Sequence, residues 1–381
     1  MTNPNSFIST LETEGIDFFT GVPDSLLKNF CACIADTRTD RHVTAANEGG
    51  AIALASGHYL ATGRPALVYM QNSGQGNAVN PMVSLADPDV YSIPMVLLVG
   101  WRGEPGVKDE PQHIKQGKIT ISLFETIGVP VSVLPDGEDD ALRAAAAAVR
   151  HAVAESRPVA LVARKGCFAD VTLQSRKPDL SPLRREDAIE AILWSIGDKA
   201  VVVSTTGMIS REVYETRERL GQRHGRDFLT VGSMGHASMI ALGIARECNA
   251  VDPNRYVVCL DGDGAAIMHM GSLAITGAAH QANLIHVVLN NAAHDSVGGQ
   301  PTVADSVDLP AVARACGYSV LPSASTLEGI AAALADGPFE GPRPSFLEIR
   351  VSKGARKDLG RPTVAPAASK TAFMAALRAE R

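Results

Sequence analysis

Short apolar runs rich in β-branched residues alternate along the whole chain with longer, alanine-rich amphipathic stretches. This alternation is typical of parallel sheets whose strands are joined by crossover helices. Six such runs fall in each half of the chain, so we predict two six-stranded α/β domains. The predicted strands are residues 16–19, 42–46, 65–70, 95–100, 129–134 and 158–163, and then 200–204, 227–231, 256–260, 284–289, 317–321 and 345–350.

A polar segment separates the two sets of strands. Residues 169–184 contain two prolines and lack a helical period, so we predict a linker there. The first domain is then expected to span 1–175 and the second 185–381. The segments 48–74 and 235–264 each contain a small-residue helix, a loop, a strand and a polar glycine turn, which suggests duplication of one fold. Open α/β sheets bind ligands at the carboxyl ends of strands, so both glycine turns are candidate binding elements.

The sharpest chemical signal is VVCLDGDGAAIMH, in which a predicted strand leads through Gly262, Asp263 and Gly264 into a helix. Backbone N–H groups at the start of a helix can bind a phosphate, and the carboxylate can bind a divalent cation. A dinucleotide-binding fingerprint would require a third glycine at the position of Ile267, so a nicotinamide-dependent dehydrogenase is disfavoured.

The next predicted strand ends at Asn290 and Asn291, one strand-helix-strand unit after Asp263. The carboxylate and an amide should therefore meet at one edge of the sheet. An Asp carboxylate, an Asn side-chain oxygen, a backbone carbonyl and diphosphate oxygens would form an all-oxygen site suited to Mg²⁺. The sequence leaves open which of the two asparagines is the ligand.

A GDG turn followed by two asparagines resembles the signature of the thiamine diphosphate-dependent enzymes. In that family a glutamate of the other domain binds the aminopyrimidine, and Glu48 in AANEGGAIALASG stands after a predicted strand and before a helix. The segment VGSMGHAS resembles the element that bends the cofactor, which implies a carbonyl contact from Gly232 and a wedge role for Met234. The resemblance implies thiamine diphosphate and Mg²⁺ as cofactors, a pyrimidine-binding first domain and a diphosphate-binding second domain. It also implies cofactor contacts from Glu48, Gly207, Met208, Gly232, Met234, Gly262, Asp263, Gly264, Ala265 and Asn291, with Asp263, Asn291 and Ala293 as metal ligands.

Further segments resemble one branch of that family, the phosphonopyruvate decarboxylases: GVPDSLL, YMQNSGQGN, RKGCF, STTG, DFLTVGSMGHAS and NNAAHDSVGGQPT. The resemblance spans almost the whole chain, although Ala292 stands where a glycine is expected. It implies decarboxylation of 3-phosphonopyruvate to phosphonoacetaldehyde, a step toward phosphonate antibiotics. It also implies a homodimer or larger homo-oligomer with active sites at the subunit interface. Sulfopyruvate decarboxylase is the alternative of the same class, and a non-catalytic subunit with this fold is the alternative of another class.

The implied reaction needs proton transfers and recognition of an anion. Glu48 requires a raised pKa from burial to share a proton with the pyrimidine. Asp24, His113 and His294 are the predicted catalytic side chains besides Glu48, although a turn-capping Asp and a solvated His are equally ordinary interpretations of the first two. Asn72, Ser73, Lys115 and Arg164 are the predicted substrate contacts, with residues 101–118 as a polar loop that acts as a lid.

The net charge of -6 argues against nucleic acid or an anionic membrane as a partner, because either would be bound by a chain with a basic excess. The longest apolar run, residues 93–101, is too short to span a bilayer. The N-terminus lacks a basic start followed by an apolar run. Six scattered cysteines without metal-site spacing are typical of a reducing compartment, so we expect a cytoplasmic protein.

Overall fold

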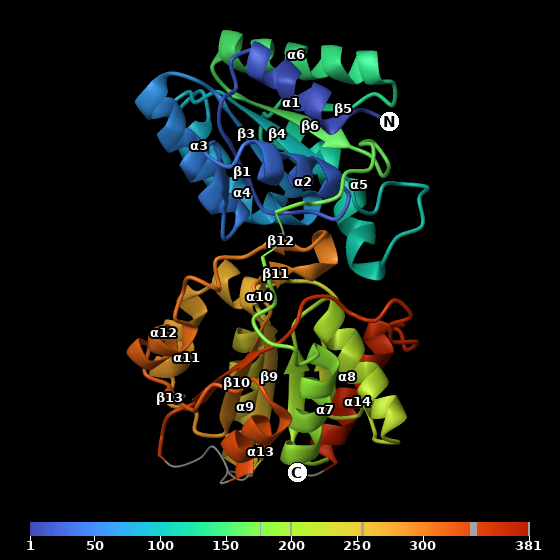
Figure 1. Cartoon of the computed structure of the whole chain (residues 1–381), viewed down its shortest axis with the longest axis vertical. Coiled ribbons are helices and arrows are strands. Elements are labelled where there is room, and N and C mark those ends of the chain that lie inside the picture. The colour runs from blue at the N-terminus through green and yellow to red at the C-terminus, as the bar shows by residue number, and fades with distance from the viewer. Residues whose placement is uncertain (176, 199, 253–254, 336–340, 380–381) are drawn as a thin grey trace. The chain divides into compact units, whose positions relative to one another are not determined.

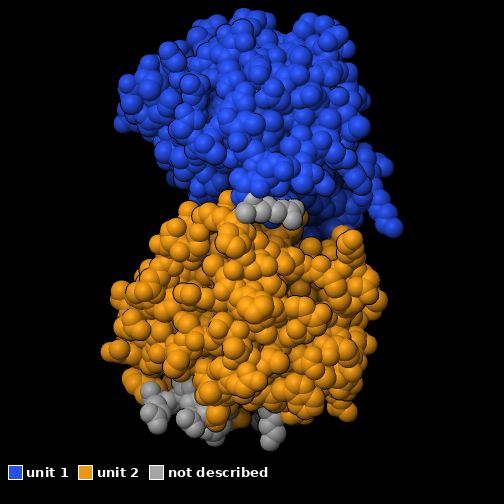
Figure 2. Space-filling view, in the orientation of Figure 1, with its two compact units in different colours: residues 1–176, 297–300 blue, residues 177–296, 301–381 orange. Residues whose placement is uncertain are grey.

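The computed structural model describes residues 1–175, 177–198, 200–252, 255–335 and 341–379. The chain divides into two compact units, residues 1–176 with 297–300 and residues 177–296 with 301–381 (Figure 2). Each unit is built on one six-stranded sheet, and the described strand pairs of both sheets are parallel. The prediction of two α/β domains with mainly parallel sheets is therefore confirmed.

The sheet of the first unit has the strand order β2-β1-β3-β4-β6-β5 (Figure 1). Its strands are β1 Phe19–Gly21, β2 His42–Thr44, β3 Ala66–Gln71, β4 Met95–Gly100, β5 Val131–Val133 and β6 Pro158–Ala163. Its helices are α1 Pro4–Thr13, α2 Lys28–Thr37, α3 Glu48–Thr62, α4 Gln75–Pro81, α5 Pro111–Thr126 and α6 Glu138–Glu155, with a 3-10 turn at Asn72–Gly74 and a π-helical turn at Met82–Ala86.

Helices cover both faces of this sheet. Since side chains alternate between the two faces along a strand, each strand contributes to the core on either side. In β3, Leu67 and Tyr69 pack in the core formed with α1, α2 and α6. Val68 and Met70 point the other way, into the core formed with α3, α4 and α5. A strand that is buried on both faces is apolar at every position, which explains the continuous apolar runs of β3 and β4.

The second unit repeats the same strand order in its own sheet, β13-β14-β10-β9-β7-β8. Numbered from first to sixth within each unit, both sheets have the order second, first, third, fourth, sixth, fifth. This shared topology agrees with the sequence echo between the two halves. The strands are β7 Val201–Ser204, β8 Asp227–Leu229, β9 Val257–Gly262, β10 Leu284–Asn290, β13 Ser319–Val320 and β14 Ser345–Arg350. The short strands β11 Ala293–His294 and β12 Gln300–Pro301 form a separate two-stranded sheet, of which Gln300 is counted with the first unit.

The helices of the second unit also cover both faces of its sheet. One face packs against α7, α8 and α13, and the other against α9, α10, α11, α12 and α14 (Figure 1). The helices are α7 Arg185–Ile196, α8 Met208–Arg219, α9 Ala237–Val251, α10 Asp263–Met268, α11 Gly271–Ala278, α12 Leu309–Ala315, α13 Leu327–Ala335 and α14 Pro366–Arg378, with a 3-10 turn at Asp295–Val297.

Two predictions about the first unit need correction. The first strand spans 19–21 and not 16–19, because Ile16 donates its backbone N–H to Leu11 and so belongs to the turn that ends α1. The predicted loop 101–118 is helical from Pro111, which occupies the first turn of α5. Proline suits that position, since the first N–H of a helix has no partner within the helix.

Within the described ranges, no helix combines the length and the apolar character that crossing a bilayer requires. The six cysteines are all free, and five of them are buried. They pack as small core residues, as the scattered spacing predicts.

Candidate active site

The carboxyl ends of four neighbouring strands of the second unit meet at one edge of its sheet. Gly207 follows β7, Gly232 and Met234 follow β8, Asp263 follows β9, and Asn291 follows β10. Because β10, β9, β7 and β8 are adjacent in this order, the predicted cofactor-binding residues of this unit gather along that edge. Gly207 has a left-handed backbone (φ 96°) and comes directly before α8, so the N-terminus of this helix opens at the same edge.

Asp263 is the first residue of α10 and is almost completely buried. Its carboxylate accepts a hydrogen bond from the hydroxyl of Thr302 at 2.5 Å, and the backbone N–H groups of Asn291 and Gly264 also donate to it. Burial nevertheless raises the pKa of Asp263 to about 6. In the part of the chain that the structure describes, no basic side chain forms an ion pair with this carboxylate. A buried carboxylate in this state would be stabilised by a divalent cation.

The two asparagines after β10 have different surroundings. Asn290 donates to Glu348 at 2.8 Å and accepts from the N–H of Ala292 at 3.0 Å, inside the sheet. Asn291 lies beside Asp263 and donates to Asp295 at 2.7 Å, while its side-chain oxygen accepts from the N–H of Ala293 at 3.0 Å. Of the two asparagines, Asn291 is the one whose backbone N–H donates to the buried carboxylate of Asp263.

The position where a glycine is expected has a left-handed backbone. Ala292 has φ 54°, a region that a residue with a Cβ adopts at a cost of about 1 kcal/mol or more. The turn thus has the conformation for which glycine is suited, and alanine adopts it here.

A steric contact explains why a glycine stands at position 264, in the GDG turn. A Cβ on Gly264 would lie 2.6 Å from the ring of His294, so only glycine fits between this ring and the chain. Desolvation lowers the pKa of His294 to about 4, so the ring is neutral at physiological pH. The structure places this predicted catalytic histidine against the GDG turn.

Glu48 lies in the first unit as the first residue of α3, which Asn47 caps. It is buried, and its carboxylate accepts from the side chain of Asn77 at 2.7 Å. Gly74 packs against it so closely that a Cβ there would lie 2.2 Å from the carboxylate. Burial raises the pKa of Glu48. Its environment therefore differs from that of a solvated acid at the start of a helix.

Asp24 is fully buried at the carboxyl end of β1. One of its oxygens accepts from the backbone N–H groups of Leu26 and Leu27, and the other accepts from Gln71 at 2.6 Å. Burial raises the pKa of Asp24. The side-chain oxygen of Gln71 in turn accepts from Ser73 at 2.7 Å, so a hydrogen-bonded chain connects two predicted site residues.

The remaining predicted site residues of the first unit differ from one another in burial and in their hydrogen-bond partners. Asn72 is fully buried, and its amide bonds to the backbone of Arg102 and to Thr120. His113 is buried on α5, where its Nδ1 has no hydrogen-bond partner among the described residues, and desolvation lowers its pKa to about 4. Lys115 is exposed on α5, and Arg164 is paired with Glu104 at 2.9 Å.

Arg102 is a further cation of this unit, and its guanidinium is held in place by two residues. It follows β4, forms a two-point ion pair with Asp109 and donates to Ser25 at 2.9 Å. Sequence reasoning did not select Arg102, Gln71 or Asn77. The rule that ligands bind at the carboxyl ends of parallel strands identifies Gln71, which ends β3, and Arg102, which lies just beyond β4.

Comparison with known proteins agrees with this geometry. The family model of the N-terminal thiamine pyrophosphate-binding domain of thiamine pyrophosphate enzymes matches residues 1–122, and the model of the C-terminal binding domain matches residues 205–349. Each match falls on one of the two six-stranded sheets, so the predicted fold of both domains is that of thiamine pyrophosphate enzymes.

Three curated proteins are similar over most of their length. Phosphonopyruvate decarboxylase of Streptomyces hygroscopicus is 37% identical, with 96% of this chain and 92% of that protein covered. Phosphonopyruvate decarboxylase of Streptomyces viridochromogenes is 38% identical, with 93% and 89% covered. Sulfopyruvate decarboxylase of Methanosarcina acetivorans is more distant, at 28% identity with 85% and 84% covered. The chain therefore belongs to the thiamine pyrophosphate enzymes, in the branch that contains the phosphonopyruvate decarboxylases.

Proposed function

We propose that the chain decarboxylates 3-phosphonopyruvate to phosphonoacetaldehyde and carbon dioxide, using thiamine diphosphate and Mg²⁺, as a step in the biosynthesis of phosphonate natural products. The observation that carries this proposal is the similarity to two phosphonopyruvate decarboxylases over at least 89% of both chains. The presence of two buried carboxyl groups, Glu48 and Asp263, supports catalysis over a non-catalytic role. The free cysteines support a cytoplasmic location.

The donor set at the edge of the second sheet fits Mg²⁺. Asp263, the side-chain oxygen of Asn291 and the carbonyl of Ala293 would hold the ion, which prefers carboxylate and amide oxygens. Met208 at the start of α8 and Ala265 in the first turn of α10, together with the glycines Gly207, Gly262 and Gly264, would receive the diphosphate. The carbonyl of Gly232 would accept from the amino group of the pyrimidine, and Met234 would separate the two rings. This assignment makes residues 185–381 the diphosphate-binding domain.

In the first domain, residues 1–175, Glu48 would bind the pyrimidine. The bound cofactor supplies a carbon nucleophile and holds the electrons that carbon dioxide leaves behind. Glu48 has to keep or share a proton at that ring, and burial shifts its pKa in the required direction. Thiamine chemistry therefore depends on a carboxyl group whose burial costs stability.

Proton transfer to the product is assigned to Asp24, His113 and His294. Asp24 has a raised pKa and a fixed orientation, and His113 is neutral and offers a buried nitrogen that no described residue contacts by a hydrogen bond. For the phosphonate, Ser73, Lys115 and Arg164 remain proposed contacts, with Asn72 orienting the backbone of Arg102. Arg102 joins them because Asp109 and Ser25 hold its guanidinium in one place.

The choice of substrate is tested by measuring carbon dioxide release from phosphonopyruvate, sulfopyruvate and pyruvate with added cofactor and Mg²⁺. We expect kcat/KM for phosphonopyruvate to exceed that for sulfopyruvate by at least ~10-fold, because a site built for one charged group discriminates against another of different shape and charge. Equal or reversed preference would assign the chain to sulfopyruvate. Release from none of the three acids by a protein that binds the cofactor would favour the non-catalytic alternative.

We also propose that the smallest active form is a homodimer in which the first domain of one subunit and the second domain of its partner share each site. Glu48→Ala and Asp263→Ala chains are each expected to be inactive. When the two are unfolded and reassembled together, each hybrid dimer would hold one doubly damaged site and one intact site. Activity should therefore return, at up to roughly a quarter of the wild-type level under random pairing. An inactive mixture with hybrid dimers demonstrated by mass spectrometry would instead indicate that each chain builds its own site.

A further inference from the structure

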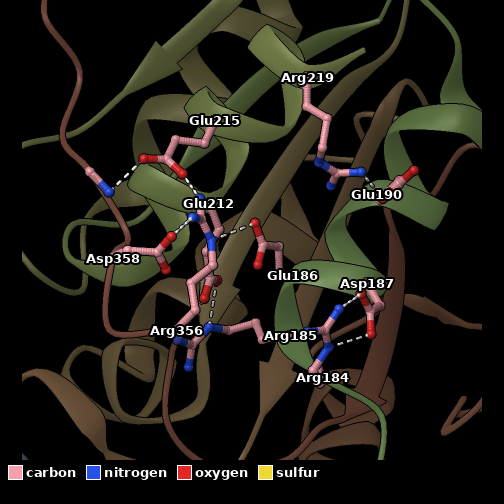
Figure 3. Close-up of polar contacts among 11 residues, drawn as sticks. Arg184, Arg185, Glu186, Asp187, Glu190, Glu212, Glu215, Arg219, Arg356 and Asp358 are labelled. Atoms are coloured by element: carbon pink, nitrogen blue, oxygen red, sulfur yellow. Dashed lines mark hydrogen bonds and ion pairs between the residues drawn. The ribbon is translucent and has the colours of Figure 1, made fainter.

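A buried ionic network lies at the amino end of α7. Arg185, the first residue of α7, is 5% exposed and forms a two-point ion pair with Glu212 of α8, at 2.7 and 3.0 Å (Figure 3). Its third nitrogen, Nη1, donates to Asp295 at 2.7 Å. Burial by itself would lower the pKa of Arg185, but the hydrogen bond and charge of Glu212 and the charge of Asp295 raise it, so the guanidinium stays charged.

Asp295 connects this network to the proposed metal site. The oxygen that accepts from Arg185 also accepts from the side-chain amide of Asn291 at 2.7 Å and from the N–H of Gly354 at 3.0 Å. A carboxylate can only accept hydrogen bonds, so Asn291 has to turn its NH₂ group toward Asp295. Its oxygen is then on the opposite side of the amide. Only that oxygen can bind a cation.

A second group of ion pairs lies near this network, and none of these pairs includes Asn291. Arg356 pairs with Glu186, Glu215 and Asp358, and Arg219 pairs with Glu190 (Figure 3). The side chain of Arg219 is 49% exposed. Exposed pairs of this kind contribute little to stability and give a matched control for Arg185.

We propose that Asp295, held by Arg185, is a positioning residue that fixes the amide orientation of Asn291 and so keeps its oxygen available to the metal ion. The proposal rests on the proposed function only in taking Asn291 as a metal ligand. The network acts through Asn291 and does not contact the metal or the substrate. Removing it should therefore weaken metal binding while leaving the remaining ligands in place.

Asp295→Ala tests this directly, because it removes the oxygen that accepts from the Asn291 amide and so permits the flipped orientation of Asn291. Arg185 keeps its ion pair with Glu212 in this variant, so no unpaired buried charge is created. We expect the Kd of the holoenzyme for Mg²⁺, measured by calorimetry with saturating thiamine diphosphate, to rise at least ~10-fold, as for outer partners of metal ligands. At saturating Mg²⁺, kcat should return to within about twofold of wild type, whereas general structural damage would not be repaired by the ion. Arg219→Gln should leave both values unchanged.

A double-mutant cycle separates positioning from other effects. If Asp295 acts through Asn291, Asp295→Ala should not weaken Mg²⁺ binding further in a chain that already carries Asn291→Ala. A full additional ~10-fold loss in that background would overturn the proposal, and so would an unchanged Mg²⁺ affinity in Asp295→Ala itself. If Asp295→Ala does not fold, Asp295→Leu, which also lacks an acceptor, is measured in its place, with the same two outcomes. Because the readout is metal binding, a wild-type protein that binds Mg²⁺ but does not use phosphonopyruvate would refute the proposed function and leave this test intact.

Discussion

Replacing Glu48 by glutamine is expected to lower kcat at least ~100-fold, which corresponds to about 2.7 kcal/mol of activation free energy. Glutamine has the same shape and can still accept the hydrogen bond from Asn77, so the fold and the binding of Mg²⁺ should be retained. It cannot hold or share the proton that the pyrimidine ring requires. The measurement is the steady-state rate of carbon dioxide release at saturating cofactor, with thermal melting as the check on folding.

Glu138 offers a matched control for this experiment. It is the first residue of α6, as Glu48 is the first residue of α3, but it is not buried. Glu138→Gln should therefore leave kcat unchanged. Near-native turnover by Glu48→Gln would remove Glu48 from the catalytic group and with it the proposed role of the first domain.

Replacing Asp263 by alanine is expected to abolish retention of thiamine diphosphate, with the affinity reduced at least ~100-fold, because the diphosphate loses the cation that would bridge it to the protein. Adding EDTA to the wild-type protein should have the same effect. Isothermal calorimetry with thiamine diphosphate and Mg²⁺ measures both. An unchanged affinity in the variant would show that the metal is held elsewhere.

The stability of the metal-free protein distinguishes loss of the site from loss of the fold. The pKa of Asp263 is raised to about 6 by burial, so the folded state binds this proton more tightly than the unfolded chain does. The contribution of Asp263 to stability is then greatest at low pH and falls as the pH rises from about 4 to about 6, so the full cost of burying its charge is present at pH 7. Asp263→Asn, which removes the charge, should melt no lower than the wild-type apoprotein at pH 7. Asp305→Asn, which removes a surface partner of Lys177, serves as the control.

The fold was predictable because the strands are buried on both faces. The observed bounds of β4 and β6, residues 95–100 and 158–163, are those predicted, since each strand is apolar throughout and ends at a turn. β1 was misplaced because Ile16 is apolar for another reason: it packs behind the end of α1. A single apolar residue next to a strand cannot be assigned from periodicity alone.

The side chains that follow strands were also partly predictable. Parallel strands bring their carboxyl ends to one edge, so the positions of Asp263 and Asn291 in the sequence already place them together. The same rule applied to β3 and β4 would have selected Gln71 and Arg102. The expectation that residues 101–118 form a lid favoured Lys115 and Arg164 instead. Lys115 is exposed on α5, and Arg164 is paired with Glu104.

The sequence by itself determined that this chain forms two α/β domains of six strands each and that the GDG turn and its asparagines meet at one sheet edge, because these features follow from local periodicity and from the geometry of parallel strands. Only the tertiary structure distinguished Asn291 from Asn290, because the two side chains are chemically identical and differ in their hydrogen-bond partners, Asp295 and Glu348. The role inferred for Arg185 likewise depends on residues far apart in the chain. Burial and the direction of a hydrogen bond are properties of the folded chain, and no local pattern encodes them.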